Sequence, residues 1–222
     1  MAGNFYLVSL KLQNRNVLII GAGTIAERKI MRLLQTDASI TVIAPVATAA
    51  IEKWAAEEKL LLHNRAFNFT DLENQTLVFA ATSDAALNIK IAAQARQNGQ
   101  WVNVATDSAE CNFHLPAEVS RGPLRISVST DGECPALTRQ LKSELERQFG
   151  PEWEPLVLAL GRVRQWLHLH ADDYQQRKKI LESLIAPENR AEFFKLEPSQ
   201  IDTAILEQTR EQLNLLRPSP DE

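Results

Sequence analysis

A glycine-rich segment near the start of the chain, Gly21-Ala22-Gly23-Thr24-Ile25-Ala26, has the spacing of a dinucleotide-binding loop. It lies between the β-branched run 16–20, which reads as a buried strand, and residues 24–34, whose apolar positions favour a helix. The first glycine permits a tight turn, the second lets a pyrophosphate approach the backbone, and the alanine keeps helix and strand close. Unpaired N–H groups at the helix start attract the anion. The expected cofactor-binding residues are Gly21, Gly23, Thr24, Ile25 and Ala26, with a purely structural glycine turn as the alternative.

The acidic residue that binds the ribose in such folds is expected about twenty residues after the loop, at the end of the second strand. Ala44-Pro45 stands there instead, and we expect both residues to line the cofactor. Without this acidic residue, its presence or absence cannot be used to distinguish NAD from NADP. No arginine stands at that strand end to hold a 2′-phosphate, which favours NAD. Arg28 and Lys29 on the first helix are expected to be solvated.

Short apolar runs alternate with amphipathic stretches over residues 16–104. This order of strand, helix and strand predicts an α/β fold, a Rossmann-like parallel sheet covered by helices on both faces. The expected strands are 16–20, 40–43, 60–63, 76–81 and 101–104, and the expected helices are 24–34, 46–58 and 85–97.

The pattern changes after Asp107. Residues 113–117 and 124–129 flank the turn-forming Ser120-Arg121-Gly122-Pro123, which predicts an antiparallel hairpin. Beyond it, helices are expected at 135–149, 152–170, 173–185 and 198–214. The expected domains are a nucleotide-binding domain at 1–112, a hairpin plus helix at 113–150, and a small C-terminal helical domain at 151–222 with a frayed acidic tail.

Six segments carry more specific patterns than the glycine loop alone. They are Leu12–Gly23, Ala26–Lys29, Phe79–Asp84, Val102–Val104, Phe113–Ala117 and Ser129–Leu137. Together they resemble the precorrin-2 dehydrogenase/sirohydrochlorin ferrochelatase family, the N-terminal module of siroheme synthase. The Ala-Glu-Arg-Lys after the glycines and the Ser-Thr-x-Gly-x-x-Pro before a helix are the most specific. The resemblance covers residues 5–150, with a looser helical match beyond.

The resemblance implies NAD-dependent oxidation of precorrin-2, a tetrapyrrole, to sirohydrochlorin in siroheme biosynthesis. Many members also insert ferrous iron to give siroheme, with Fe²⁺ as a substrate. It further implies a dimerisation segment whose strands interlock with a partner subunit, so residues 113–150 are expected to form a homodimer. Thr82, within a matched segment, is expected at the cofactor.

The chain departs from the family at two positions. The family reads Asn-Val-x-Asp after its fifth strand, with that Asp as candidate general base, whereas this chain has Asn103-Val104-Ala105-Thr106 and its acid is Asp107. One residue shifts a carboxylate by only about 3–4 Å, so Asp107 is the expected catalytic base; a solvated loop aspartate is the alternative. Cys134 replaces the usual serine and is expected to be a buried or half-buried, inert thiol. Dehydrogenase activity alone and dehydrogenase with chelatase activity are equally open.

The eight carboxylates of precorrin-2 call for hydrogen-bond donors in the substrate cleft. The expected substrate-binding residues are Arg121, Arg139, Lys142 and His114, with surface solvation as the alternative for the first three. His114 together with Asp107 is also a candidate for transient Fe²⁺ binding, with a packed or solvent-facing histidine as the default.

No permanent metal site is expected. Cys111 and His114 would face opposite sides of a strand. His168 and His170 would lie about 200° apart around a helix. Neither H-E-x-x-H nor a paired C-x-x-C occurs, and no G-x-S-x-G predicts a serine hydrolase.

The composition excludes several classes of partner. Lys and Arg number 24 against 28 Asp and Glu, a formal net charge of −4 that disfavours broad nucleic-acid binding. Residues 187–222 hold four basic and eight acidic residues, so 1–186 balance at 20 of each and do not repel a polyanionic substrate. Without a long apolar run or a secretory signal, and with two cysteines, the chain is expected to be cytoplasmic and not membrane-bound.

Two rival functions use the same features. A nucleotide-sensing Rossmann regulatory module would change conformation with ligand but would not turn over substrate. A non-catalytic scaffold would dimerise through 113–150 after losing its base. The sensing module leaves the Ser-Thr-x-Gly-x-x-Pro segment unexplained.

Overall fold

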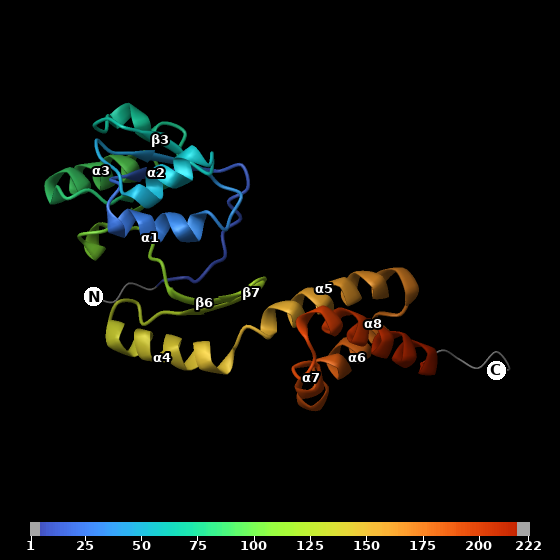
Figure 1. Cartoon of the computed structure of the whole chain (residues 1–222). Coiled ribbons are helices and arrows are strands. Elements are labelled where there is room, and N and C mark those ends of the chain that lie inside the picture. Colours follow the sequence, from blue (N-terminus) through green and yellow to red (C-terminus); the bar gives the residue numbers. More distant parts are fainter. Residues whose placement is uncertain (1–4, 217–222) are drawn as a thin grey trace. The chain divides into compact units, whose positions relative to one another are not determined.

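The computed structural model describes residues 5–216, which divide into two compact units (Figure 1). One unit comprises Tyr6–Leu115, and the other is formed mainly by the chain from Pro116 onward. The predicted frayed tail, residues 217–222, lies outside the described residues. Within residues 5–216, no helix has the length and apolar character needed to cross a membrane.

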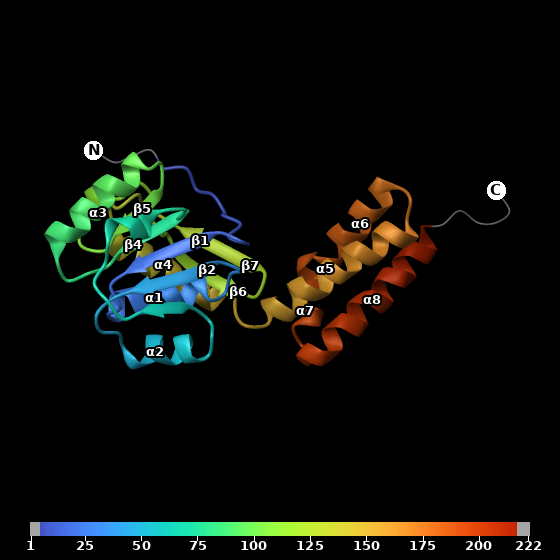
Figure 2. The same cartoon turned by 90° about the horizontal axis from the view of Figure 1, so that it is seen from above.

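The first unit is built on a five-stranded sheet with the strand order β3-β2-β1-β4-β5, and all neighbouring strands are parallel (Figure 2). The strands are β1 (Asn16–Ile20), β2 (Ser39–Ile43), β3 (Leu61–His63), β4 (Leu77–Ala80) and β5 (Trp101–Val104). The predicted parallel sheet is confirmed, with each strand end within one residue of the expected place.

Helices cover both faces of this sheet. The helices are α1 (Thr24–Leu33), α2 (Ala49–Ala56) and α3 (Ala85–Gln97). Because side chains alternate along a strand, Val17 and Ile19 of β1 pack with α1 and α2. The intervening Leu18 and Ile20 pack with α3 on the opposite face. All four side chains are buried, which explains the unbroken apolar run of β1.

The sequence patterns do not predict two short 3-10 helices, η1 (Phe69–Leu72) and η2 (Ser108–Glu110). The first lies in the connection from β3 to β4, where Asn68 and Asp71 form a reciprocal capping box. The second follows β5 and is capped at its N-terminus by Asp107. Each is too short to show an apolar period.

The second unit opens with an antiparallel hairpin of β6 (Ala117–Arg121) and β7 (Leu124–Val128). The predicted hairpin is present, but its first strand begins at Ala117 rather than at Phe113, and its turn is reduced to Gly122-Pro123. Gly122 has φ +55°, the left-handed backbone that favours glycine in a two-residue reversal.

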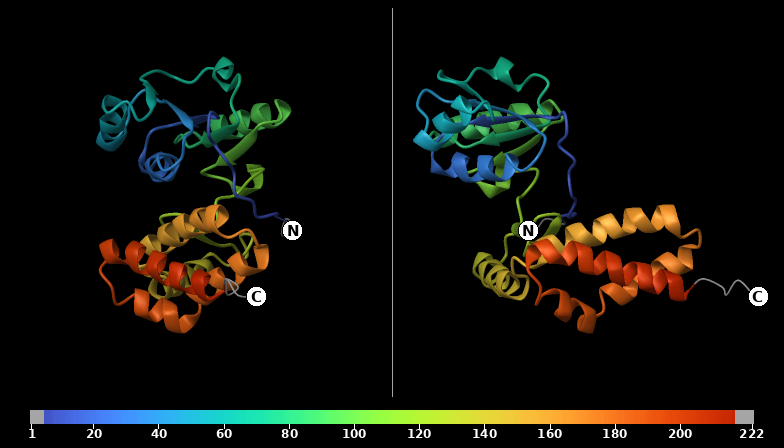
Figure 3. Two further views of the ribbon diagram at one scale, coloured as in Figure 1. Left: turned by 90° about the vertical axis from the view of Figure 1, so that its right-hand side faces the viewer. Right: turned by 45° about the vertical axis from the view of Figure 1, so that its right-hand side comes forward.

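Within the described residues, five helices complete the second unit: α4 (Pro135–Gln148), α5 (Trp153–His170), α6 (Tyr174–Leu184), α7 (Pro187–Phe193) and α8 (Pro198–Leu215). The sequence predicts all of them except α7. Helices α5 to α8 pack together (Figure 3). They share one apolar core, which includes Leu156, Val163, Leu167, Ile180, Phe193, Ile201 and Ile205. Helix α4 packs on the hairpin and has no fully buried residue.

Candidate active site

The glycine loop lies where the strand order of the sheet reverses, because β1 has β2 on one side and β4 on the other. The Gly21 N–H donates to the Ile43 carbonyl at the end of β2 (2.9 Å), and the Ala81 N–H donates to the Ile20 carbonyl (2.8 Å). Gly21 has φ +100°, and a Cβ on it would overlap the Ala81 carbonyl. Only glycine fits this position without strain. Ligands of open α/β sheets bind at such a switch point.

Gly23 is the N-cap of α1 and meets a different requirement, an unobstructed backbone. Apart from its two chain neighbours, no atom of residues 5–216 lies within 4 Å of the place where its Cβ would stand, so the backbone is open above the loop. Among the described residues, no side chain caps the start of α1, and Thr24 and Ile25 in its first turn are exposed. Ala26 is fully buried against the sheet. An open backbone at an uncapped helix N-terminus fits the pyrophosphate of a dinucleotide.

The segment after β2 closes against this loop. Ala44 is buried, and Pro45 is exposed. The Thr48 N–H donates to the Ala22 carbonyl (3.1 Å), and its hydroxyl donates to the Glu27 carboxylate (2.9 Å). Glu27, from the Ala-Glu-Arg-Lys motif, therefore anchors the β2 loop beside the glycines.

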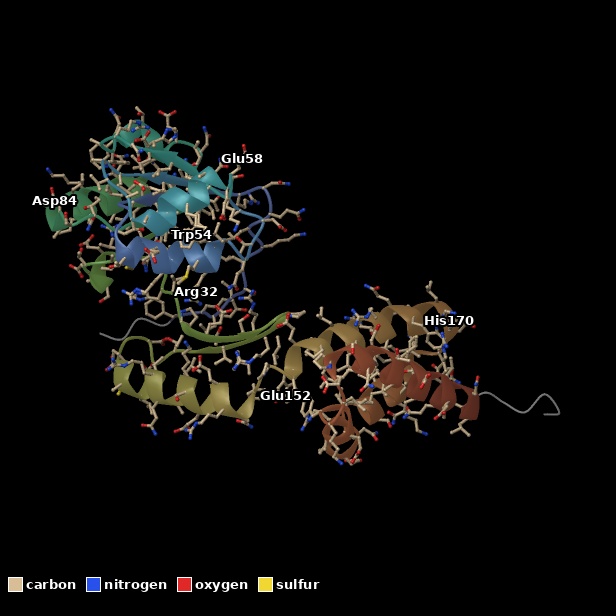
Figure 4. The ribbon with its side chains drawn as sticks, viewed as in Figure 1. Arg32, Trp54, Glu58, Asp84, Glu152 and His170 are labelled. Carbon is tan, nitrogen blue, oxygen red and sulfur yellow. The ribbon has the colours of Figure 1, made fainter. Side chains whose placement is uncertain are left out.

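A buried asparagine outside the predicted site residues organises the loops after β4 and β5. Asn88 of α3 accepts hydrogen bonds from the Thr82 N–H (3.2 Å) and hydroxyl (2.7 Å). Its amide N–H groups donate to the Thr82 carbonyl (3.0 Å) and the Thr106 hydroxyl (3.4 Å). Asp84, labelled in Figure 4, caps the same helix by accepting the Leu87 N–H (3.0 Å). The available signal is a polar residue at an apolar helix position, in register with Ile91 and Ala95.

Asp107 lies in the exposed loop that follows β5. One carboxylate oxygen accepts the Ala109 N–H (2.9 Å) and so caps η2. Among residues 5–216, no donor binds the second oxygen, which leaves it facing solvent. The geometry is that of an Asx turn with a free carboxylate oxygen, so the cap and a proton-accepting role are compatible.

The returning end of this loop is bound to the outer edge of β5. The Asn112 side chain accepts the Val102 N–H (2.6 Å) and donates to the Gln100 carbonyl (2.8 Å), while its own N–H donates to the Val102 carbonyl (3.1 Å). The Cys111 sulfur accepts the Val104 N–H (3.1 Å). These contacts explain why the hairpin begins only after Pro116, because the preceding residues bind back to β5.

The Cys111 thiol is half-buried, and burial raises its pKa above the ordinary range. The thiol therefore stays protonated and serves the loop as a hydrogen-bonding group. Cys134, in contrast, is exposed at the start of α4, where its N–H donates to the Thr130 hydroxyl (3.1 Å). The expectation of a buried or half-buried Cys134 is wrong, because α4 offers no fully buried position.

Lys29 is not solvated as expected. Its ammonium donates to Asn103 Oδ1 on β5 (2.7 Å) and lies 5.3 Å from the centre of the Phe79 ring. Burial lowers the pKa of Lys29 below the usual lysine value; the nearby Cys111 opposes this shift, while Arg28 and Arg32 add to it. The lysine of the Ala-Glu-Arg-Lys motif thus extends from α1 to the edge strand β5.

The expected substrate-binding residues fall in different units. His114 is half-buried in the first unit, which also holds Asp107. In the second unit, Arg121 is half-buried and donates to the Ser120 and Glu146 carbonyls (2.8 and 3.3 Å). Arg139 on α4 is exposed. Lys142, one turn further along α4, lies 3.3 Å from the Glu146 carboxylate. Arg139 is therefore the most exposed of the three expected donors in that unit.

Two family models cover successive parts of the chain. Residues 8–117 match a family described as putative NAD(P)-binding, and residues 121–148 match the central part of the sirohaem biosynthesis protein. The precorrin-2 dehydrogenase of Priestia megaterium is 34% identical over 190 residues, which cover 86% of this chain and 94% of the relative. The chain belongs to the precorrin-2 dehydrogenase family.

A solved structure of this family has the same fold along almost the whole chain. SirC, a precorrin-2 dehydrogenase, is 32% identical, with a TM-score of 0.78 over 95% of this chain and 98% of SirC. The siroheme synthase of Pseudoalteromonas atlantica is 39% identical over 181 residues, which cover 82% of this chain and 39% of that protein. The chain thus spans about two fifths of such a siroheme synthase and nearly all of a precorrin-2 dehydrogenase. The predicted family and its nicotinamide-binding fold are confirmed.

Proposed function

We propose that this chain oxidises precorrin-2 to sirohydrochlorin, with NAD as the hydride acceptor. The observation that carries the proposal is the open backbone at Gly23, where α1 begins at the switch point of a parallel sheet. Membership of the precorrin-2 dehydrogenase family supports the choice of substrate.

The oxidation removes a hydride and a proton from the substrate, so two acceptors are needed. The nicotinamide ring of the bound cofactor supplies the hydride acceptor. The start of α1 binds the pyrophosphate through its free N–H groups, and the loop bearing Thr82 is held by Asn88. Asp107 accepts the proton through its uncapped carboxylate oxygen.

The residues around the end of β2 support NAD over NADP. A 2′-phosphate requires a nearby cation, and residues 44–48 are Ala-Pro-Val-Ala-Thr. Arg65, which follows the neighbouring strand β3, directs both terminal nitrogens to the Asp71 carboxylate (2.8 and 2.7 Å). Because both terminal nitrogens bind Asp71, Arg65 is already neutralised within the protein and is a poor partner for a 2′-phosphate.

The central test is an anaerobic assay of the purified chain with precorrin-2 and NAD, in which NADH is followed by absorbance. We expect NADH to form in proportion to sirohydrochlorin, with NAD preferred over NADP. Binding of NAD without NADH formation would favour the nucleotide-sensing module, and failure to bind NAD would favour the scaffold. Ferrous iron added to the same mixture separately tests insertion, through the absorbance of siroheme.

We also propose that residues 113–150 form a homodimer. Leu137, Leu141 and Leu145 recur every four residues along α4, and none of them is fully buried within the chain. Leu137 is 44% exposed. A regular apolar stripe on an incompletely covered helix is typical of an oligomer interface.

Leu137→Asp is expected to convert the dimer to a monomer. A carboxylate buried in an apolar interface costs roughly 2 kcal/mol or more, which weakens association at least tenfold. Size-exclusion chromatography with light scattering measures the change. The matched control is Gln140→Asp at an exposed polar position of the same helix, which should remain dimeric. A dimeric Leu137→Asp protein would contradict this interface.

A further inference from the structure

Lys29 is a half-buried cation that forms no ion pair within the part of the chain that the structure describes. Its ammonium has two neutral partners, Asn103 Oδ1 at 2.7 Å and the face of the Phe79 ring at 5.3 Å. Among residues 5–216, no carboxylate forms an ion pair with it. The Cys111 thiol also lies near the ammonium, but burial raises the pKa of that thiol, so it stays neutral. Its charged neighbours on α1, Arg28 and Arg32, are cations. Burying an ammonium without a compensating anion costs free energy, so the fold alone does not account for this residue.

The ammonium is held in a fixed position. Asn103 is buried, and its amide donates to the Phe113 carbonyl (3.2 Å), which orients Oδ1 toward Lys29. An ammonium has three N–H donors, and Asn103 accepts one of them. The Phe79 ring stabilises the cation through its π face and accepts no conventional hydrogen bond. N–H donors of the Lys29 ammonium thus remain for an anion. Because the side chain is already positioned, binding loses little conformational entropy there.

Lys29 also lies on the helix that begins at the cofactor loop. Ile25, Lys29 and Arg32 are spaced i, i+4 and i+7, so they share one face of α1 (Arg32 is labelled in Figure 4). Ile25 is 42% exposed in the first turn. The face therefore combines an exposed apolar side chain with cations, which suits a ligand that has an apolar body and carboxylate groups.

We propose that Lys29 binds a carboxylate of the tetrapyrrole substrate. This assignment rests on the proposed function and adds a substrate contact within the first unit, beside the cofactor loop. Asn103 is the positioning residue that directs the ammonium. The binding step is a charge-assisted hydrogen bond and transfers no electrons or protons.

The test compares Lys29→Met with Arg28→Met. The two variants remove the same charge from adjacent positions of α1, but the Arg28 side chain is exposed, whereas Lys29 is half-buried. For Lys29→Met we expect the KM for precorrin-2 to rise about tenfold or more, the strength of a hydrogen bond to a charged group. The Kd for NAD should be unchanged, and the Tm should be equal or higher because a desolvated charge is removed. Arg28→Met should change the KM by no more than about twofold.

A second ligand separates this inference from the proposed reaction. Uroporphyrin III is a stable porphyrin that carries the same number of carboxylates, and its binding is followed by fluorescence without turnover. We expect Lys29→Met to weaken uroporphyrin binding and Lys29→Arg, which keeps the charge, to bind within about threefold of the wild type.

The outcomes are distinguishable. If the wild type forms no NADH, the proposed function fails, and the uroporphyrin titration still decides whether Lys29 binds a polycarboxylate. If the wild type turns over but Lys29→Met has an unchanged KM and unchanged uroporphyrin affinity, Lys29 does not contact the substrate. A raised Kd for NAD with an unchanged KM for precorrin-2 also overturns the proposal, because Lys29 would then serve the cofactor.

Discussion

Gly23→Ala is expected to leave the fold intact and to weaken NAD binding about 10–100-fold, equivalent to roughly 1–3 kcal/mol. Gly23 has φ −87°, which alanine adopts without strain, and beyond the two chain neighbours the added methyl group meets no atom within 4 Å in the described part of the chain. The methyl group instead fills the open space above the start of α1, where the pyrophosphate must approach the backbone. Titration with NADH fluorescence gives the affinity, and thermal unfolding confirms that the fold is retained.

Gly21→Ala is the matched control, because it adds the same methyl group two residues earlier. Gly21 has φ +100°, and its Cβ would overlap the Ala81 carbonyl. We expect the free energy of unfolding to fall by about 3 kcal/mol or more, from the combined strain and overlap. Chemical denaturation measures this loss. Wild-type NAD affinity in Gly23→Ala would mean that the pyrophosphate does not bind at this helix start.

Asp107→Asn is expected to lower kcat about 10²–10⁴-fold while the fold and the substrate KM values stay close to those of the wild type. Asparagine keeps the side-chain oxygen that accepts the Ala109 N–H, so the η2 cap survives. It replaces the uncapped carboxylate oxygen by an amide that accepts no proton at neutral pH. Steady-state NADH formation over a range of pH measures the effect, since loss of a general base also removes the corresponding limb of the pH profile.

Two further variants test whether the effect belongs to this carboxylate. Ser108→Ala, at the next exposed position, should retain the wild-type rate. Thr106→Asp in the background of Asp107→Asn moves the carboxylate by one residue and should restore part of the activity, because Thr106 is exposed in the same loop. A full rate for Asp107→Asn would assign proton removal to another group.

The sequence predicts the sheet well because its strands carry their own signal. The apolar run of β1 is continuous, and the structure shows that both faces of this strand are covered. Helix α7 is missed because its seven residues include a single buried side chain, Phe193, which gives no period to detect. The start of the hairpin is misplaced because Asn112 and Phe113 bind to β5, and a local pattern does not reveal that contact.

The candidate site divides in the same way. The roles of Gly21 and Gly23 follow from the absence of a Cβ, so the residue type alone is enough to predict them. The environment of Lys29 depends on Asn103, 74 residues away, and that of Thr106 depends on Asn88. The Asn88–Thr106 contact arises because β4 and β5 are neighbours in the sheet, and the Lys29–Asn103 contact arises because α1 covers one face of that sheet. A sequence pattern identifies the donors and acceptors but not their partners.

The contacts along β5 also protect the protein against self-association through its sheet. As the last strand of the order, β5 would present a row of unpaired N–H and C=O groups on its outer side, a template for strand addition and aggregation. Instead, Asn112 forms hydrogen bonds with the Gln100 carbonyl and with both main-chain groups of Val102, and the Cys111 sulfur accepts the Val104 N–H. The segment that leads out of the first unit thus blocks that edge without adding a sixth strand to the sheet.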